Sequence, residues 1–149
     1  MDVSKINSLV ELYFKKVEQI DKKKPFLKWL NPKNNHQYNW EEVTEKIYKF
    51  SYKIKSLIKE GDRVLLLSEN RPEWLIADLA IMTIGAITVP AYITSTKEDY
   101  EYILKHSGAR CAIVSNHTLA EKLIPASLNS PKCENIIKID FESYQYNDP

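Results

Sequence analysis

The sequence predicts an α/β fold, a three-layer βαβ domain with a mainly parallel sheet and an N-terminal β-hairpin. From residue 63 onward, short apolar runs alternate with segments whose apolar residues recur at helical spacing, which is the pattern of βαβ units. These runs are apolar on both faces, as is typical of parallel strands that helices cover on both sides. With 149 residues, 44% of them hydrophobic, residues 1–149 fit a single compact domain.

The first predicted element is an amphipathic helix near the N-terminus. Its apolar residues recur at spacings of three and four, and they are Ile6, Leu9, Val10, Tyr13, Val17 and Ile20. The basic run DKKKP (21–25) ends it. Such a helix could lie on a membrane surface or on its own domain, and the mixed charges of its polar face favour the second arrangement.

A β-hairpin is predicted next, followed by a second helix. The segments PFLKWL (25–30) and HQYNW (36–40) are separated by Asn and Pro residues that form turns. Asn39 with Glu42 three positions later predicts a capping box, and Gly61 is expected to end the helix in a left-handed conformation. The apolar residues of this helix step by four and three, and they are Val43, Ile47, Phe50, Ile54 and Leu57.

The heptad SENRPEW (68–74) connects the apolar strand RVLLL (63–67) to a helix predicted from Glu73 to Ile84. Pro72 suits the first helical turn, which needs no amide hydrogen, and Glu73 complements the positive end of the helix dipole. We expect Trp74 to be largely buried as the anchor of this turn. The polar heptad thus leaves a buried strand, reverses the chain and begins a helix.

The same alternation continues to the end of the chain. Gly85 ends the third helix, and Ser95 with Glu98 predicts a capping box for a fourth helix that ends at Gly108. A short fifth helix, HTLAEKLI (117–124), is expected to end at Pro125. Four strands should form one parallel core sheet with helices on both faces, at Val64 to Leu67, Ala86 to Tyr92, Cys111 to Ser115 and Ile136 to Ile139.

Composition and charge exclude several classes of protein. The 21 basic and 20 acidic residues give a formal charge of +1, so no global field favours nucleic acid and none is expected as a partner. The two cysteines, Cys111 and Cys133, lie too far apart in sequence for a metal or redox motif and indicate a cytoplasmic setting. No apolar run is long enough for a transmembrane segment, which leaves at most a peripheral association with a membrane.

The chain offers few groups for catalysis or phosphate binding. Ligands of such a domain bind beyond the carboxyl ends of its strands, here residues 68–71, 92–96 and 115–117. A phosphate-binding loop at these places requires glycines, but all three glycines follow predicted helices. The three histidines are scattered, and the adjacent carboxylates lie at helix starts. We therefore expect no catalytic residue, no metal site and no independent nucleotide site in this chain.

Two segments resemble the N-terminal region of the AMP-forming acyl-CoA synthetases, which are adenylate-forming enzymes. They are SENRPEWLIADLAIMTIGAITVPAY (68–92) and TSTKEDYEYILKHSGARCAIVSN (94–116), and the resemblance extends from about Pro25 to Asn116. It is closest to the long-chain fatty-acid–CoA ligase branch. The residues that carry this structural signature are Asn70, Pro72, Glu73, Trp74, Gly85 and Pro90.

The resemblance implies an activity for a larger enzyme. Members of that family react a carboxylic acid with ATP to form an acyl-adenylate, release pyrophosphate and then transfer the acyl group to CoA, with Mg2+ and a lysine that stabilise phosphoryl charge. Their phosphate loop and catalytic lysine have no counterpart here, so this chain is expected to be an inactive N-terminal fragment of an AMP-binding domain, with no cofactor of its own. Its partner would be the remainder of the synthetase. An apolar surface left uncovered would allow self-association.

The resemblance also suggests a weak candidate for a CoA or substrate pocket. The stretch after TVPAY resembles the place where some relatives approach CoA, which makes Tyr92, Thr94 and Thr96 candidates for the pocket edge. The family's glycines and arginines are absent there, and turn or capping roles explain the same residues. The alternative to a ligase fragment is a stand-alone, non-catalytic binding or regulatory module with the same fold. Neither the acyl-chain length nor the oligomeric state is indicated.

Overall fold

A four-stranded parallel sheet forms the centre of the computed structural model, which describes residues 3–30 and 35–139. Its strands are β3 (Arg63–Leu67), β4 (Ile87–Ala91), β5 (Cys111–Val114) and β6 (Asn135–Lys138), in the spatial order β4-β3-β5-β6. Leu65 aligns with Val89 of β4 on one side and with Ala112 of β5 on the other. The predicted parallel sheet is confirmed, and the predicted strand ends are correct to within one residue.

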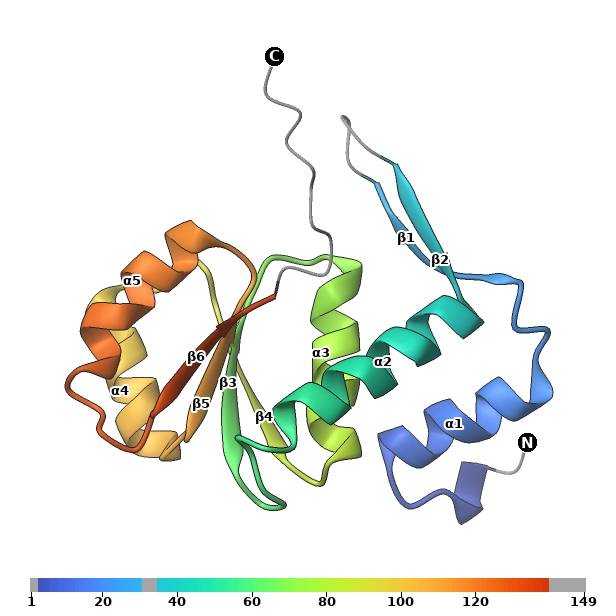
Figure 1. Cartoon of the computed structure of the whole chain (residues 1–149), viewed down its shortest axis with the longest axis horizontal. Helices are drawn as coiled ribbons and strands as arrows, with labels where there is room; N and C mark the ends of the chain where they lie inside the picture. The colour runs from blue at the N-terminus through green and yellow to red at the C-terminus, as the bar shows by residue number, and fades with distance from the viewer. Residues whose placement is uncertain (1–2, 31–34, 140–149) are drawn as a thin grey trace.

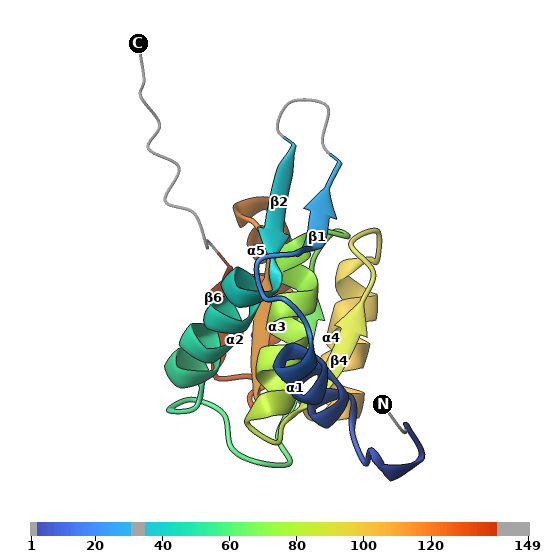
Figure 2. The same cartoon turned by 90° about the vertical axis from the view of Figure 1, so that its right-hand side faces the viewer.

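Helices cover both faces of this sheet, as predicted (Figure 1). On one face lie α2 (Trp40–Ile54) and α3 (Pro72–Thr83), with α1 (Leu9–Gln19) packed against the outside of α3 (Figure 2). On the other face lie α4 (Lys97–Ser107) and α5 (His117–Ser127). The central strands are buried on both sides because successive residues point to opposite faces: Leu66 belongs to the core under α2 and α3, and Leu65 to the core under α4 and α5.

The predicted hairpin consists of β1 (Pro25–Trp29) and β2 (His36–Asn39), which pair antiparallel. It projects from the body of the domain next to the N-terminal end of α3 (Figure 2). A short 3-10 turn, η1 (Val3–Lys5), precedes α1. At the base of the hairpin, the rings of Phe26 and Trp40 stack with centroids 3.8 Å apart, and this contact attaches the hairpin to the start of α2.

One predicted helix cap is confirmed, and another is displaced by one residue. The Asn39 capping box is confirmed, since Asn39 Oδ1 accepts from Glu42 N at 2.9 Å and Glu42 Oε2 accepts from Asn39 N at 2.7 Å. The predicted cap of the fourth helix at Ser95 is wrong by one residue. Thr96 is the cap, because its hydroxyl oxygen accepts from Asp99 N at 3.2 Å and the Asp99 carboxylate accepts from Thr96 N at 2.8 Å.

Two predicted helix ends are also wrong. Helix α2 ends at Ile54, so Gly61, with φ of +80°, turns the chain into β3 instead of capping the helix, and Leu57 is 45% exposed. Helix α5 continues through Pro125 to Ser127, and Leu128 N still donates to Ile124 O. Pro125 lacks the N–H that would donate to the carbonyl of Glu121, and Glu121 is an exposed residue. The predicted stops at Gly85 and Gly108 are confirmed by their left-handed conformations.

Among the described residues, no helix combines the length and the apolar character needed to cross a bilayer.

Candidate functional site at the carboxyl edge of the sheet

The order of the strands places a topological switch point between β3 and β5. The chain leaves β3 through α3 on one face of the sheet and leaves β5 through α5 on the other face. Adjacent strands whose connections diverge in this way open a crevice at their carboxyl ends, where doubly wound domains bind ligands. The residues that follow the two strands, Ser68 and Glu69 after β3 and Ser115 and Asn116 after β5, meet at this crevice.

The Glu69 carboxylate occupies the crevice. Asn116 Nδ2 donates to Glu69 Oε1 at 2.7 Å, and the Ser115 hydroxyl donates a close hydrogen bond to Glu69 Oε2. Burial raises the pKa of the Glu69 carboxyl, but the hydrogen bonds from Ser115 and Asn116 and the nearby Arg71 charge bring it below its ordinary value. Glu69 is therefore held as a carboxylate that joins the loops after β3 and β5.

This carboxylate takes the position that an anionic ligand would need. Asn116 is the N-cap of α5, and its Oδ1 accepts from Leu119 N at 2.9 Å. The positive end of α5 thus lies beside Glu69, where the chain supplies its own negative charge. A triphosphate placed in this crevice would meet the Glu69 carboxylate instead of a free cradle of amides. The residues of the crevice do not fit the phosphates of ATP.

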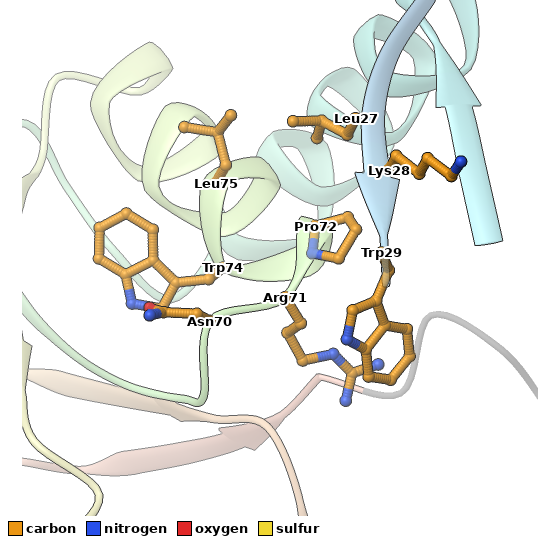
Figure 3. Close-up of a pocket in the computed structure, with 8 residues that line it drawn as sticks. All are labelled: Leu27, Lys28, Trp29, Asn70, Arg71, Pro72, Trp74 and Leu75. Atoms are coloured by element: carbon orange, nitrogen blue, oxygen red, sulfur yellow. The ribbon is translucent and has the colours of Figure 1, made fainter. Parts of the chain in front are cut away.

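The turn between β3 and α3 holds a second polar cluster. Pro72 is the first residue of α3, as predicted, whereas Glu73 is only 3% exposed. Its carboxylate accepts from the Tyr38 hydroxyl at 3.1 Å and from Arg71 Nε at 2.6 Å. The Arg71 guanidinium in turn lies over the Trp29 ring, 5.1 Å from its centroid (Figure 3). The SENRPEW heptad therefore fastens the hairpin to the first turn of α3.

Two hollows flank this turn. One, of about 260 Å³, lies between the hairpin and the turn, with Trp29 and Arg71 on one side and Asn70 and Trp74 on the other (Figure 3). The second, of about 360 Å³, lies at the carboxyl ends of β3 and β4, where Trp74 and Asn70 also form part of its wall. Trp74 is partly buried and packs against the core, so most of its side chain is covered, as predicted. The ring packs against the core beside α3 on one side and lines both hollows on the other.

The predicted pocket-edge residues occupy different positions. Tyr92 lines the second hollow and is 82% exposed, while its carbonyl accepts from the Tyr100 hydroxyl at 2.8 Å. Pro90, on the edge strand β4, lines the same hollow. Thr94 is exposed and Thr96 caps α4, and neither lines a hollow described here. The structure thus brings Tyr92 together with Asn70 and Trp74 and leaves the two threonines apart from them.

Other reactive groups are buried or dispersed. Burial, with a smaller contribution from Cys133, raises the pKa of the Cys111 thiol to about 12, which keeps it protonated. Within residues 3–30 and 35–139, no three His, Cys, Asp or Glu side chains are grouped so that they could hold a metal ion. Within the described residues, the carboxyl edge of the sheet holds the polar clusters of Glu69 and Glu73. Burial raises the pKa of both cysteine thiols, so neither has the character of a nucleophile.

Comparison with known families explains this combination of fold and heptad. A family described as AMP-binding enzyme matches residues 14–148, nearly the whole chain. The chain belongs to the AMP-binding enzyme family. Its Glu69 and Glu73 clusters lie within the matched region, as do all the strands of the central sheet.

Individual relatives support the family assignment. The mitochondrial acyl-coenzyme A synthetase ACSM3 of Pongo abelii is 32% identical over 118 residues, which are 75% of this chain and 19% of that protein. The long-chain-fatty-acid–CoA ligase FadD15 of Mycobacterium tuberculosis is 34% identical over 82 residues, which are 55% of this chain and 14% of that protein. The chain therefore spans a fifth or less of the length of these AMP-binding relatives.

Solved structures show the same fold. The anthranilate CoA ligase AuaEII in complex with anthranoyl-AMP superposes with a TM-score of 0.79 at 23% identity, over 93% of this chain and 27% of that one. The N-terminal subdomain of Klebsiella oxytoca NpsA superposes with a TM-score of 0.66 at 22% identity, over 73% of this chain and 28% of that one. The predicted resemblance to the N-terminal subdomain of adenylate-forming enzymes is confirmed.

The sequence predicted the positions of these loops but not the contacts between them. Residues 68–71 and 115–117 were expected at the carboxyl edge, yet neither the Glu69 bridge nor the burial of Glu73 was predicted. The one available signal was a glutamate two residues after a buried strand, a position where a charge needs partners. Those partners lie 46 and 47 residues further along the chain, beyond the range of local patterns.

Proposed function

We propose that this chain is the N-terminal part of a fatty-acid–CoA ligase that forms acyl-CoA from a fatty acid, ATP and CoA through an acyl-adenylate. The observation that carries the proposal is the family match over residues 14–148 in a chain that spans only 19% and 14% of two relatives. A long-chain fatty acid is the proposed substrate, because FadD15 is among the relatives and the sequence resembles that branch. The proposed location is the cytoplasm, with peripheral association at a membrane as part of the proposal.

In this proposal the chain contributes scaffold and not chemistry. Glu69 closes the switch-point crevice, and Arg71 is engaged by Glu73 and Trp29, so neither side chain is placed to hold phosphate. ATP, Mg2+ and CoA would be bound by the remainder of the ligase, which is the proposed partner. Tyr92, at the rim of the hollow beside Trp74, stays our candidate for a contact with CoA or substrate, with Thr94 and Thr96 beside it in the sequence.

A chimaera tests the scaffold role. We would replace the matching part of M. tuberculosis FadD15 with residues 14–148 of this chain and measure AMP release from ATP, palmitate and CoA. The chimaera should release AMP in a palmitate-dependent manner, whereas a matched FadD15 variant that lacks this part should not. A chimaera that folds but is as inactive as the deletion would contradict the proposal.

The chain alone provides the complementary test. It should not exchange labelled pyrophosphate into ATP, because the described residues offer no free phosphate cradle. Exchange above a blank would contradict the proposal that this chain lacks the chemistry. The second candidate function, a stand-alone non-catalytic binding module, would be favoured if the chimaera were inactive and the chain remained monomeric without any ligase partner.

A further inference from the structure

A groove of about 680 Å³ runs between α2 and the last residues of β6, and its lining residues differ from those around Glu69. Its floor is apolar and includes Phe50 and Ile54 of α2 and Ile137 and Ile139 from the end of the sheet. Leu57, just beyond α2, lines the same groove and is 45% exposed. The volume lies in the range of pockets that bind small molecules, about 300–1,000 Å³.

The rim of this groove is predominantly basic. Three lysines of α2, Lys46, Lys49 and Lys53, recur at spacings of three and four and so lie along one side of the helix. Lys138 of β6 is the fourth lysine of the groove, whereas the acidic residues of its lining are Glu42 and Glu45. Glu45 is already paired with Lys49 at 2.9 Å. A segment with apolar rings and carboxylates would complement this combination of floor and rim.

The groove lies along an open edge of the sheet. Ile139 N donates to Val114 O at 2.7 Å, and Ile137 aligns with Ile113. Because backbone groups alternate in direction along a strand, those of Ile137 and Ile139 face β5 and those of Ile136 point away from it. The opposite edge is different. Ile87 N donates to Asp62 O, so Ile87 directs its backbone groups toward β3. Because this direction alternates along a strand, the backbone of Pro90 faces the open edge of β4, where proline has no N–H to donate. Within the described residues, the β6 edge is thus better suited than β4 to receive an extended segment.

The chain itself supplies a segment of the matching chemistry directly after the groove. Residues 140–149, DFESYQYNDP, lie outside the described residues; they contain three carboxylate side chains, three aromatic rings and no basic residue. Ten extended residues span at most about 35 Å, whereas the 15 residues of α2 extend about 22 Å. The segment begins directly after Ile139, which lines the groove, and is long enough to follow α2.

We propose that residues 140–149 of the same chain dock in the groove between α2 and β6, with their carboxylates on the lysines of α2 and their rings on the apolar floor. The segment would then cover Leu57 and Ile137. This inference does not depend on the proposed ligase function, since it rests on the groove, its charge and the sequence that follows it.

Zero-length carbodiimide cross-linking of the full chain tests the proposal. A mixture of 14N- and 15N-labelled chains at low micromolar concentration distinguishes cross-links within one chain from cross-links between chains. We expect cross-links within one chain from Lys49 or Lys53 to Asp140, Glu142 or Asp148, at a yield independent of protein concentration. Cross-links from the segment only to lysines outside the groove, or only between chains, would overturn it; the latter would assign the groove to a second copy.

A charge variant provides the second measurement. Lys49→Gln with Lys53→Gln should accelerate hydrogen exchange of the amides in residues 141–146 at least about threefold. The variant removes two of the lysines that hold the docked segment, and an undocked segment loses its protection from exchange. The matched control, Lys16→Gln with Lys97→Gln, removes two exposed lysines elsewhere and should leave this exchange unchanged. Equal exchange rates in the groove variant and the control would contradict the docking.

Discussion

The Tyr38 hydroxyl donates a 3.1 Å hydrogen bond to the Glu73 carboxylate and thereby links β2 of the hairpin to the first turn of α3. Both residues are buried, with 4% and 3% of their surfaces exposed. The second Glu73 oxygen accepts from Arg71 Nε at 2.6 Å, so the buried carboxylate has a charged partner as well as a neutral one. A charge at such a position requires these partners, because an unpaired carboxylate in the core is strongly unfavourable.

Tyr38→Phe should therefore destabilise the domain by about 1.5–3 kcal/mol, the usual range for a hydrogen bond to a charged group. The free energy of unfolding would be measured by urea titration. Tyr52→Phe is the matched control, since Tyr52 is 71% exposed and its loss of a hydroxyl should change stability by less than about 0.5 kcal/mol. Equal effects of the two substitutions would show that the Tyr38–Glu73 bond contributes nothing specific.

Trp74→Ala should cost about 1–3 kcal/mol, less than the 3–5 kcal/mol typical of a fully buried tryptophan, because the side chain packs against the core but is only partly buried. Urea titration is again the measurement. A loss below about 1 kcal/mol would place the ring on the surface in solution, and a loss above about 4 kcal/mol would place it in the core.

The Glu69 bridge should make stability depend on acidic pH. Because the pKa of Glu69 is lowered in the folded state, its contribution is fully present above the unfolded value near 4.5 and is lost as pH falls through the lower folded value. Glu69→Gln should flatten this part of the stability curve between about pH 5 and pH 3. Urea midpoints across that range would measure it. Glu98→Gln, an exposed control in the first turn of α4, should leave the curve unchanged.

Cys111 should be inert in the native protein. Its pKa of about 12 keeps the thiol protonated at pH 8, and the side chain is fully buried, so iodoacetamide should label it only after unfolding. Since the thiol of the unfolded chain ionises first, stability should decline as pH rises above about 8.5. Mass spectrometry of native and urea-treated samples provides the measurement. Cys133, half-buried, serves as the internal comparison, and faster native labelling of Cys111 than of Cys133 would be inconsistent with the structure.

The sequence by itself determined the local elements of this protein. Alternation of apolar runs with helical periodicity predicted the four parallel strands, and residues three positions apart predicted the capping box of Asn39 and Glu42. These features depend on residues two to four positions apart along the chain, so they can be predicted from the local sequence. One local rule gave a wrong prediction: Pro125 does not end α5, because the helix loses only the hydrogen bond to the carbonyl of Glu121, an exposed residue.

Only the tertiary structure decided which distant groups meet. Glu69 reaches Ser115 across 46 residues, and Glu73 is buried by Tyr38 from 35 residues earlier in the chain. Both contacts follow from the order β4-β3-β5-β6 and from the position of the hairpin beside α3, and periodicity encodes neither. A strand pattern specifies that a residue is buried, whereas its neighbours depend on which strands pair and which faces the connecting helices cover. The same pairing left β6 at the edge of the sheet, with a basic groove beside it.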